Sequence, residues 1–482
     1  MSICVTTFLL LLAMVTTISC LQELEVVQMA HTQVLQARNW VQAFVALHKS
    51  SQDWNNHVGM SLSDCAKLYD ESESRLARLF SDESYTHDDA RTWLSGVSAN
   101  YRSCLDGLGE KGFAEAHEVV KNLTMLLSEA LALYGKSVGK TKGKPNGQKM
   151  DQNGGNLLSW NPATSKANFI VAKDGSGTHR TINDAVAALS RMSRIRSQRV
   201  IIYVKSGVYN ENVEIERNMK NVMLVGDGMD KTIVTGNRNV PGGFTTFNSA
   251  TFGVWGDGFW ARDMTFENTA GPQKQQAVAL RVMSDHAVFY RCSFKGYQDT
   301  LLVHSLRQFY RDCHIYGTID FIFGDASVVF QNCDIFVRRP MDHQANIITA
   351  QGRDDPNENS GISIQGSRVR PAPDFVGVKN SFRTYLGRPW KRYSRTVYMK
   401  TDLDGLIDPK GWIEWLGDFA LSTLFYGEYM NTGVGASTKG RVQWLGFHVL
   451  KNPQEASPFT ISNFIQGESW IPMTGVPMGP GI

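Results

Sequence analysis

The sequence is short of net charge and of long apolar runs. Its 49 basic and 46 acidic side chains leave a formal charge of only +3, which is too little to indicate nucleic-acid binding, although it is compatible with an acidic polymer as substrate. Beyond residue 22 no segment reads as a membrane span. The 482 residues therefore predict a globular protein of at least two domains, whose partner has to be deduced from a site.

Several catalytic signatures are missing as well. The chain has no G-x-S-x-G turn, no H-E-x-x-H helix, and no His and Cys cluster at metal-ligand spacing. Neither a serine-hydrolase nor a zinc mechanism is indicated, and we expect no metal and no organic cofactor.

Residues 1–20 predict a signal peptide. Residues 1–22 carry no charge, and the apolar run Phe8–Val15 is followed by small polar residues, although the usual basic start is absent. An uncleaved anchor is the alternative. The sequon at Asn122 also favours the secretory route and predicts glycosylation there. We expect a secreted protein.

Residues 21–136 predict an all-α helical bundle. Apolar residues recur at intervals of three and four with almost no Gly or Pro. We expect Trp93, Leu94, Val97 and Tyr101 to form a buried face, and Cys65 and Cys104 to join two helices.

Residues 137–165 differ sharply in composition from the segments on either side. They are rich in Gly, Lys, Asn and Gln, which predicts a flexible basic linker and a domain boundary.

Residues 166–482 predict an all-β domain with a repeat. Segments 289–292, 310–313 and 330–333 align as aromatic-x-x-Cys, at a period of about twenty residues. This pattern favours a right-handed parallel β-helix, in which equivalent residues of adjacent coils lie about 4.8 Å apart. We therefore expect a disulfide between Cys313 and Cys333, with Cys292 free.

The same period brings two carboxylates together. Asp320 follows Asp299 by 21 residues, and Gln276 precedes Gln298 by 22. Of two neighbouring carboxyls, one can attack an ester while the other holds a proton for the leaving alcohol, and the amides can donate to an oxyanion. An isolated Asp in a β-helix is more often a turn or ladder residue, but the combination favours ester hydrolysis.

Seven segments of the chain resemble plant-type pectin methylesterases with an N-terminal inhibitor-like region. The matching segments begin at VAKDGSGTHRTINDAV near residue 171 and include TTFNSATFGV, GPQKQQAVALR, GYQDTLLVHS, GTIDFIFG and LGRPW. SDCAKLYDES and RTWLSGVSANYRSCLDG carry a weaker resemblance to the inhibitor-like domain.

The resemblance implies a role for each matched residue. Asp320 would be the nucleophile and Asp299 the proton donor and general base, with Gln298 and Gln276 stabilising the oxyanion. Arg388 would orient Asp320, while Thr246 and Trp390 would contact the polysaccharide. The implied substrate is methyl-esterified polygalacturonate in the cell wall. The helical region, or a separate inhibitor protein, would be a further partner.

The sequence departs from the family pattern at several places. Leu302 stands where Tyr is usual, the basic processing motif before the catalytic domain is absent, and so is the early cysteine pair of free inhibitor proteins. Cleavage and inhibition therefore stay open.

Two other functions are alternatives. A glycosidase or lyase would cut the polymer backbone, and an inverting glycosidase needs carboxyls about 6.5–9.5 Å apart. A non-catalytic wall-binding protein would not need the two carboxylates and amides.

Overall fold

A computed structural model shows two compact units, Met1–Gly147 and Gln148–Ile482, which we describe separately. The structure describes residues 2–48, 58–81, 84–109, 116–136, 141–142, 156–192 and 198–482, with side chains for 22–46, 59–81, 84–109, 122–136, 156–192 and 198–482. Within these ranges no helix is both long enough and apolar enough to span a membrane. The proposed signal peptide has no described side chains, and much of the proposed linker lies outside these ranges.

The first unit is helical, as predicted. Its helices are α1 (Ser2–His48), α2 (Val58–Phe80), α3 (His87–Gly109) and α4 (Ala116–Gly135), and its short strands β1 (Tyr85–Thr86) and β2 (Thr141–Lys142) pair antiparallel. Trp93, Leu94, Val97 and Tyr101 are all buried on α3. The disulfide between Cys65 and Cys104 is present and joins α2 to α3, which confirms that prediction.

Local hydrogen bonds explain why α3 begins where it does. Thr86 Oγ1 accepts a bond from the Asp89 amide (3.0 Å), and Asp89 Oδ2 accepts one from the Thr86 amide (2.8 Å). This reciprocal pair satisfies two amides at the start of the helix. Asn122, the predicted glycosylation site, is exposed on α4.

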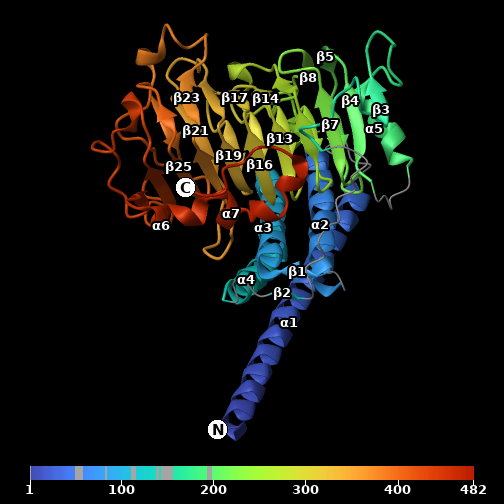
Figure 1. The fold of residues 1–482 in the computed structure, drawn as a ribbon, viewed down its shortest axis with the longest axis vertical. Coiled ribbons are helices and arrows are strands. Elements are labelled where there is room, and N and C mark those ends of the chain that lie inside the picture. Colours follow the sequence, from blue (N-terminus) through green and yellow to red (C-terminus); the bar gives the residue numbers. More distant parts are fainter. Residues whose placement is uncertain are drawn as a thin grey trace. The chain divides into compact units, whose positions relative to one another are not determined.

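The second unit is built from three parallel sheets, whose strands succeed one another from β3 to β28 along the unit (Figure 1). The chain visits the sheets in turn, so each coil adds one strand to each, which is the parallel β-helix predicted. The 7-stranded sheet contains β6 (Val213–Ile215), β9 (Phe252–Val254), β12 (Leu280–Val282), β15 (Leu301–Val303), β18 (Ile322–Gly324), β21 (Asn346–Gln351) and β24 (Thr384–Gly387).

The other two sheets complete the coils. The 11-stranded sheet contains β3 (Phe169–Val171), β4 (Val200–Val204), β7 (Val222–Gly226), β10 (Trp260–Arg262), β13 (Ala287–Tyr290), β16 (Arg307–Arg311), β19 (Ser327–Gln331), β22 (Gly361–Gln365), β25 (Arg395–Met399), β27 (Phe425–Tyr429) and β28 (Phe447–Val449). The 8-stranded sheet contains β5 (Gly207–Asn210), β8 (Thr232–Gly236), β11 (Thr265–Asn268), β14 (Ser293–Lys295), β17 (His314–Gly317), β20 (Asp334–Val337), β23 (Arg368–Pro371) and β26 (Asp402–Leu403).

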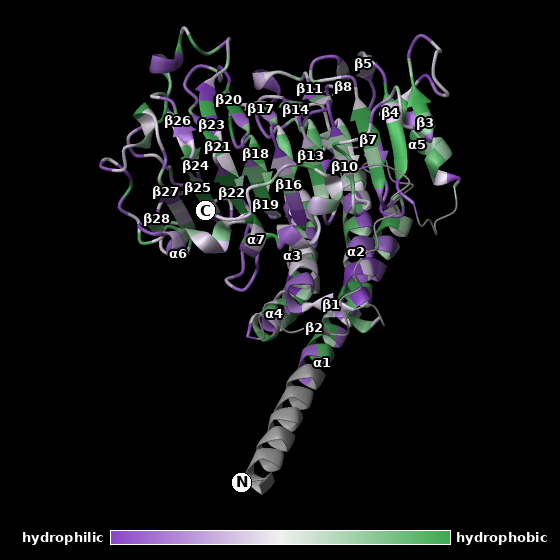
Figure 2. Ribbon diagram, viewed as in Figure 1, coloured by the Kyte–Doolittle hydropathy of each residue, from purple (hydrophilic) through white to green (hydrophobic). Residues whose placement is uncertain are grey.

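Aromatic stacks show that the predicted register is correct. Phe289 pairs with Tyr310 and Tyr310 with Phe330 on successive strands. Their rings stack at centroid distances of 4.8 and 4.6 Å inside the coil. Apolar residues dominate strands such as β4 and β7 (Figure 2), and they fill the interior.

The prediction of a disulfide between Cys313 and Cys333 is wrong. Both thiols are free and buried, as is Cys292. Each thiol is instead held by backbone carbonyls: Cys313 Sγ donates to the Phe289 and Arg311 oxygens, and Cys333 Sγ to the Tyr310 and Gln331 oxygens. Side chains at equivalent positions of adjacent coils point the same way, one strand spacing apart, whereas a disulfide needs Cβ atoms about 3.5–4.5 Å apart.

The predicted linker, residues 137–165, extends too far toward the C-terminus. Leu157 and Trp160 are buried against the outer face of the 11-stranded sheet. The Arg262 guanidinium donates to the carbonyls of Leu157, Leu158 and Trp160. Within the second unit the chain is therefore packed against the sheet from Leu157, before the predicted start at residue 166. Two apolar residues in a polar stretch give little signal in the composition.

Three short helices accompany the coils. α5 (Ile182–Ser190), capped by Thr181, packs Ile182, Ala185 and Leu189 into the interior. α6 (Pro453–Ala456) and α7 (Ile461–Phe464) contribute Ala456, Ile461 and Phe464 to the apolar cluster on the outer face of the 11-stranded sheet.

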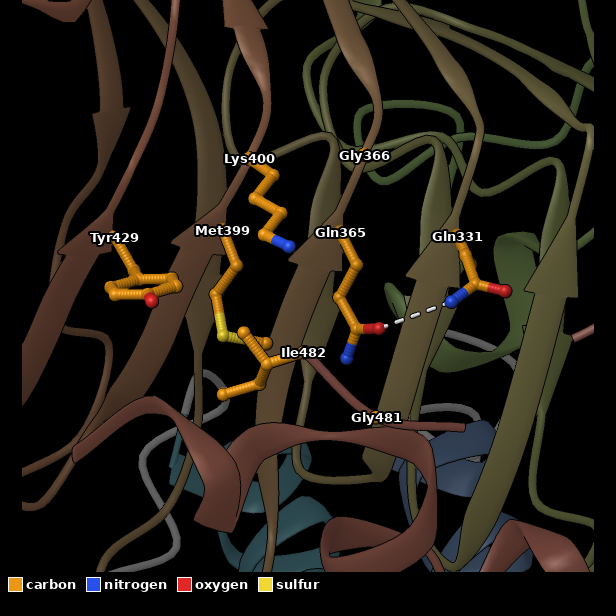
Figure 3. Close-up of a pocket in the computed structure, with 8 residues that line it drawn as sticks. All are labelled: Gln331, Gln365, Gly366, Met399, Lys400, Tyr429, Gly481 and Ile482. Carbon is orange, nitrogen blue, oxygen red and sulfur yellow. Dashed lines mark hydrogen bonds between the residues drawn. The ribbon is translucent and has the colours of Figure 1, made fainter. Parts of the chain in front are cut away.

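A small pocket lies on that outer face, beside the C-terminal segment (Figure 3). Gln331 donates to Gln365 (3.3 Å) and to the Gly479 carbonyl (3.0 Å), and Met399, Lys400 and Tyr429 complete the wall. None of its lining residues is one of the predicted site residues.

Candidate active site

Asp299 and Asp320 lie at equivalent places on successive coils, two residues before strands β15 and β18. Leu301 pairs with Ile322 in parallel register, and the Asp299 amide donates to the Ile319 carbonyl (3.0 Å). Both aspartates have positive φ, 61° and 50°, at the turn into their strands. Asp can adopt this conformation more readily than most residues. The predicted juxtaposition of the two carboxylates is thus built by the coil period.

Arg388 binds Asp320 through two hydrogen bonds. Its Nε donates to Oδ1 (2.9 Å) and its Nη2 to Oδ2 (2.6 Å). Arg388 follows β24 directly, and its amide donates to the Thr349 carbonyl of β21 (3.0 Å). The bidentate geometry fixes the orientation of the carboxylate as well as supplying a countercharge.

Burial and the ion pair act on Asp320 in opposite directions. The Asp320 side chain is 7% exposed and that of Arg388 25%. Burial raises the pKa of Asp320 above its ordinary value, while the hydrogen bonds and charge of Arg388 pull the pKa down, and burial is the larger effect. Asp320 is consequently a carboxylate that is poorly solvated and dependent on one cation.

Gln298 immediately precedes Asp299, and Gln276 lies one coil earlier. The Ala277 amide donates to the Gln298 carbonyl (3.3 Å), so the two glutamines belong to adjacent coils. Both are partly exposed. Within the described part of the chain, Gln276 Oε1 is buried without a hydrogen-bond partner. A buried amide oxygen of this kind is costly unless another group donates to it, and a hydroxyl-rich ligand would supply such a donor.

An apolar floor adjoins the carboxylates on the outer face of the 7-stranded sheet. Leu301 and Ile322 point into the core, so the alternating residues Leu302 and Phe323 point outward. They pack with Ala250, Val278, Ala350 and the partly buried Trp390. The Trp390 and Phe323 rings meet edge to face at 6.0 Å. Trp390 can pack closely against the backbone at residue 352 because this residue is glycine. A Cβ atom at this position would lie only 2.9 Å from the Trp390 ring.

Thr246 lies before β9, near the turns that carry the glutamines. It precedes the short 3-10 helix Phe247–Ser249, and its carbonyl accepts a bond from Ser249 Oγ (2.7 Å). The Thr251 amide in turn donates to the Val278 carbonyl (3.0 Å). Thr246 is partly exposed.

Two histidines of the β-helical unit, His304 and His286, have ring contacts. His304 is buried with its ring edge to face against Phe247 at 5.7 Å, and His286 stacks on Trp470 at 4.9 Å. In the described ranges no three His, Cys, Asp or Glu side chains gather as a metal site.

One neighbour of the site had no signal in the sequence. The Trp415 ring lies 4.3 Å from the guanidinium carbon of Arg388. The two residues lie on successive coils, since Trp412 forms a parallel bridge with Gly387, but this pairing falls outside the segments whose repeat is aligned in the sequence. A tryptophan near an arginine could have been suggested only by assuming a cation–π contact.

Both units match known families. Residues 168–468 match the family described as Pectinesterase, and residues 3–133 match Plant invertase/pectin methylesterase inhibitor. The chain is 60% identical to "Probable pectinesterase/pectinesterase inhibitor 36" of Arabidopsis thaliana, covering 98% of this chain and 97% of that protein. It is 51% identical to "Pectinesterase 2" of Citrus sinensis, covering 89% and 83%.

Solved structures agree with this match. The pectin methylesterase from carrot aligns with a TM-score of 0.64 and 53% identity, covering 66% of this chain and 98% of that one. The enzyme from Aspergillus niger aligns with a TM-score of 0.54 and 32% identity, covering 63% and 95%. The chain belongs to the pectinesterase family, and its β-helical pectinesterase unit is preceded by a helical unit of the inhibitor family.

Proposed function

We propose that this pectinesterase hydrolyses the methyl esters of pectin with Asp320 as nucleophile and Asp299 as acid and base. The observation that carries the proposal is the bidentate ion pair of Asp320 with Arg388, one coil away from Asp299. It supplies an oriented, ionised carboxylate next to a second carboxyl that can hold a proton. Family membership supports ester hydrolysis over cleavage of the polymer backbone and over binding alone.

The first half of the reaction forms an acyl-enzyme. An Asp320 oxygen attacks the ester carbonyl of a galacturonate unit, and the carbonyl π electrons move to its oxygen. The amides of Gln298 and Gln276 donate to this oxyanion. When the oxyanion collapses, the C–OCH3 bond breaks and Asp299 gives its proton to the departing oxygen, releasing methanol. An anhydride between Asp320 and the substrate remains.

The second half returns both carboxyls to their starting states. Asp299, now ionised, removes a proton from water as that water attacks the substrate carbonyl of the anhydride. The C–O bond to Asp320 breaks, giving a free galacturonate carboxyl and an ionised Asp320. Each cycle consumes one water and yields one methanol and one carboxyl, with no redox step.

The proposed substrate contacts lie along the outer face of the 7-stranded sheet. Trp390 borders the apolar floor and offers a ring to the sugar, and the partly exposed Thr246, just before the 3-10 helix Phe247–Ser249, is the second proposed contact. Homogalacturonan, the methyl-esterified polygalacturonate of the cell wall, is the partner we propose. The polymer becomes more acidic as its esters are removed.

The N-terminal part of the chain bears on two further proposals, inhibition of the esterase and secretion of the protein. Its match to an inhibitor family supports inhibition of the β-helical unit by this unit within the same chain, and a separate inhibitor protein is a further proposed partner. The apolar start of the sequence supports secretion to the cell wall, with removal of residues 1–20.

The function is tested by measuring two products at once. The protein is incubated with highly esterified pectin while methanol and new reducing ends are followed. We expect methanol and titratable carboxyls to appear in equal amounts with no new reducing ends. Reducing ends without methanol would identify a backbone-cutting enzyme, and binding without either product would identify a wall-binding protein.

A further inference from the structure

The residues just before Trp415 are anchored firmly in the β-helix. Trp412, three residues earlier, is fully buried, and its ring stacks on Tyr426 at a centroid distance of 4.1 Å. Residue 412 forms a parallel bridge with Gly387, and the Ile413 amide donates to the Gly387 carbonyl (3.1 Å). Gly387 immediately precedes Arg388. The loop that carries Trp415 is therefore anchored to the strand that presents Arg388.

The ring and the carboxylate engage different parts of one guanidinium. Asp320 takes the edge of Arg388 through Nε and Nη2. The Trp415 ring centroid lies 4.3 Å from Cζ, and the Trp415 side chain is 37% exposed. An aromatic ring attracts a guanidinium placed over its face and is compatible with hydrogen bonds at the edge.

We propose that Trp415 is a positioning residue that keeps the Arg388 guanidinium on Asp320 in the reactive geometry. The proposal rests on the function proposed above, in which Asp320 is the nucleophile. Without the ring, the partly exposed Arg388 side chain gains other rotamers that reach solvent. Asp320 then spends part of its time without its cation, and a buried carboxylate without a cation takes up a proton more readily.

The other charged and titratable groups around the pair do not replace this cation. Asp299 is a carboxyl on the preceding coil, and Tyr426 is a buried phenol whose pKa is raised by burial and also by the charge of Asp320. The Lys391 ammonium lies over the Trp390 ring, 5.2 Å from its centroid. Glu414, next to Trp415, is exposed and acidic. Loss of the Arg388 contact therefore leaves the Asp320 carboxylate without a compensating cation.

The test compares Trp415→Ala, Trp415→Phe and Leu416→Ala in the full-length protein. Methanol release from esterified pectin gives kcat and KM across the acid range. We expect Trp415→Ala to lower kcat roughly 5- to 30-fold, as expected from the usual strength of a cation–π contact, and to move the acid limb of kcat to higher pH. Trp415→Phe should restore both within about threefold, because a ring remains over the guanidinium.

Leu416→Ala is the matched control, since Leu416 is the next residue and is 77% exposed. It should leave kcat and its acid limb unchanged. If Leu416→Ala reproduced the effect of Trp415→Ala, the conformation of the loop rather than the ring would be responsible, and the proposal would be overturned. It would equally be overturned if Trp415→Ala raised KM while kcat and its acid limb stayed as in the wild type, since Trp415 would then only contact the sugar.

A measurement without substrate separates this proposal from the proposed function. The carboxyl carbon of Asp320 is titrated by NMR in protein labelled with 13C-aspartate, and its signal is identified by its loss in Asp320→Asn. We expect the titration midpoint to be higher in Trp415→Ala than in the wild type. Normal methanol release with an unchanged midpoint refutes the positioning role alone. A raised midpoint in a protein that releases no methanol supports the positioning role and refutes the function.

Discussion

Replacing Arg388 by Gln or Lys measures how much the ion pair with Asp320 contributes to kcat/KM. The two charge-assisted hydrogen bonds would each contribute about 1.5–3 kcal/mol in a buried setting. Because a quarter of the Arg388 side chain is exposed, solvent screening brings the pair closer to about 2–3 kcal/mol in total. This corresponds to a fall in kcat/KM of roughly 30- to 150-fold for Arg388→Gln near neutral pH.

The pH profile and a control make this prediction specific. Arg388→Gln should move the acid limb of kcat/KM to higher pH, because Arg388 lowers the pKa of Asp320 and only burial, which raises it, remains. Arg388→Lys should fall between wild type and Arg388→Gln, because an ammonium keeps the charge but loses the bidentate fork.

Arg383→Gln is the control for a general loss of charge, since Arg383 is 73% exposed and lies just before β24. It should keep methanol release within about twofold of wild type. The reasoning is refuted if Arg388→Gln stays within threefold of wild type with its acid limb unmoved.

Three further predictions concern protonation and cysteines. As the pH is lowered, the wild type should lose activity at a pH above the usual titration range of an aspartate, because burial raises the pKa of Asp320 and the nucleophile must be ionised. A profile whose acid limb lies in the usual aspartate range would contradict this. By linkage, the contribution of Asp320 to stability is present at low pH and lost as pH rises through its raised pKa. In protein lacking residues 1–20, a thiol reagent should modify no cysteine in the native state and three cysteines after denaturation without reductant. Modification of only one cysteine after denaturation would instead indicate a disulfide between Cys313 and Cys333. Replacing Cys65 and Cys104 by Ser should destabilise the helical unit by about 4 kcal/mol, from the 39-residue separation they close, and an unchanged urea midpoint for that unit would count against it.

The period of the β-helix was readable from the sequence because it repeats in residue type. Phe289, Tyr310 and Phe330 fall in register as the aligned segments predicted, and Asp299 and Asp320 follow from the same period. Three successive coils place an aromatic residue at the same interior position, so the repeat appears in the sequence. The helices of the first unit were equally readable, because their apolar residues recur at helical spacing.

Other features depend on directions and loops, which spacing does not encode. The period placed Cys313 beside Cys333 but could not show that each thiol donates to a backbone carbonyl. Leu157 and Trp160 were too sparse in a polar stretch to reveal that they are buried. The contact between Trp415 and Arg388 joins successive coils where Trp412 bridges Gly387, outside the segments whose repeat was aligned. Leu302, which stands where Tyr is usual in the family, is buried in the apolar floor.

The most direct test of the central claim is methanol release by Asp320→Asn compared with wild type. Asn keeps the shape of the side chain and can still accept a bond from Arg388, but it cannot attack as a carboxylate. With thermal unfolding used to confirm that the variant is folded, we predict a loss of at least about 10³-fold in kcat, as for removal of other catalytic nucleophiles. A folded Asp320→Asn protein that retains activity within tenfold of wild type would contradict the assignment of Asp320 as the nucleophile.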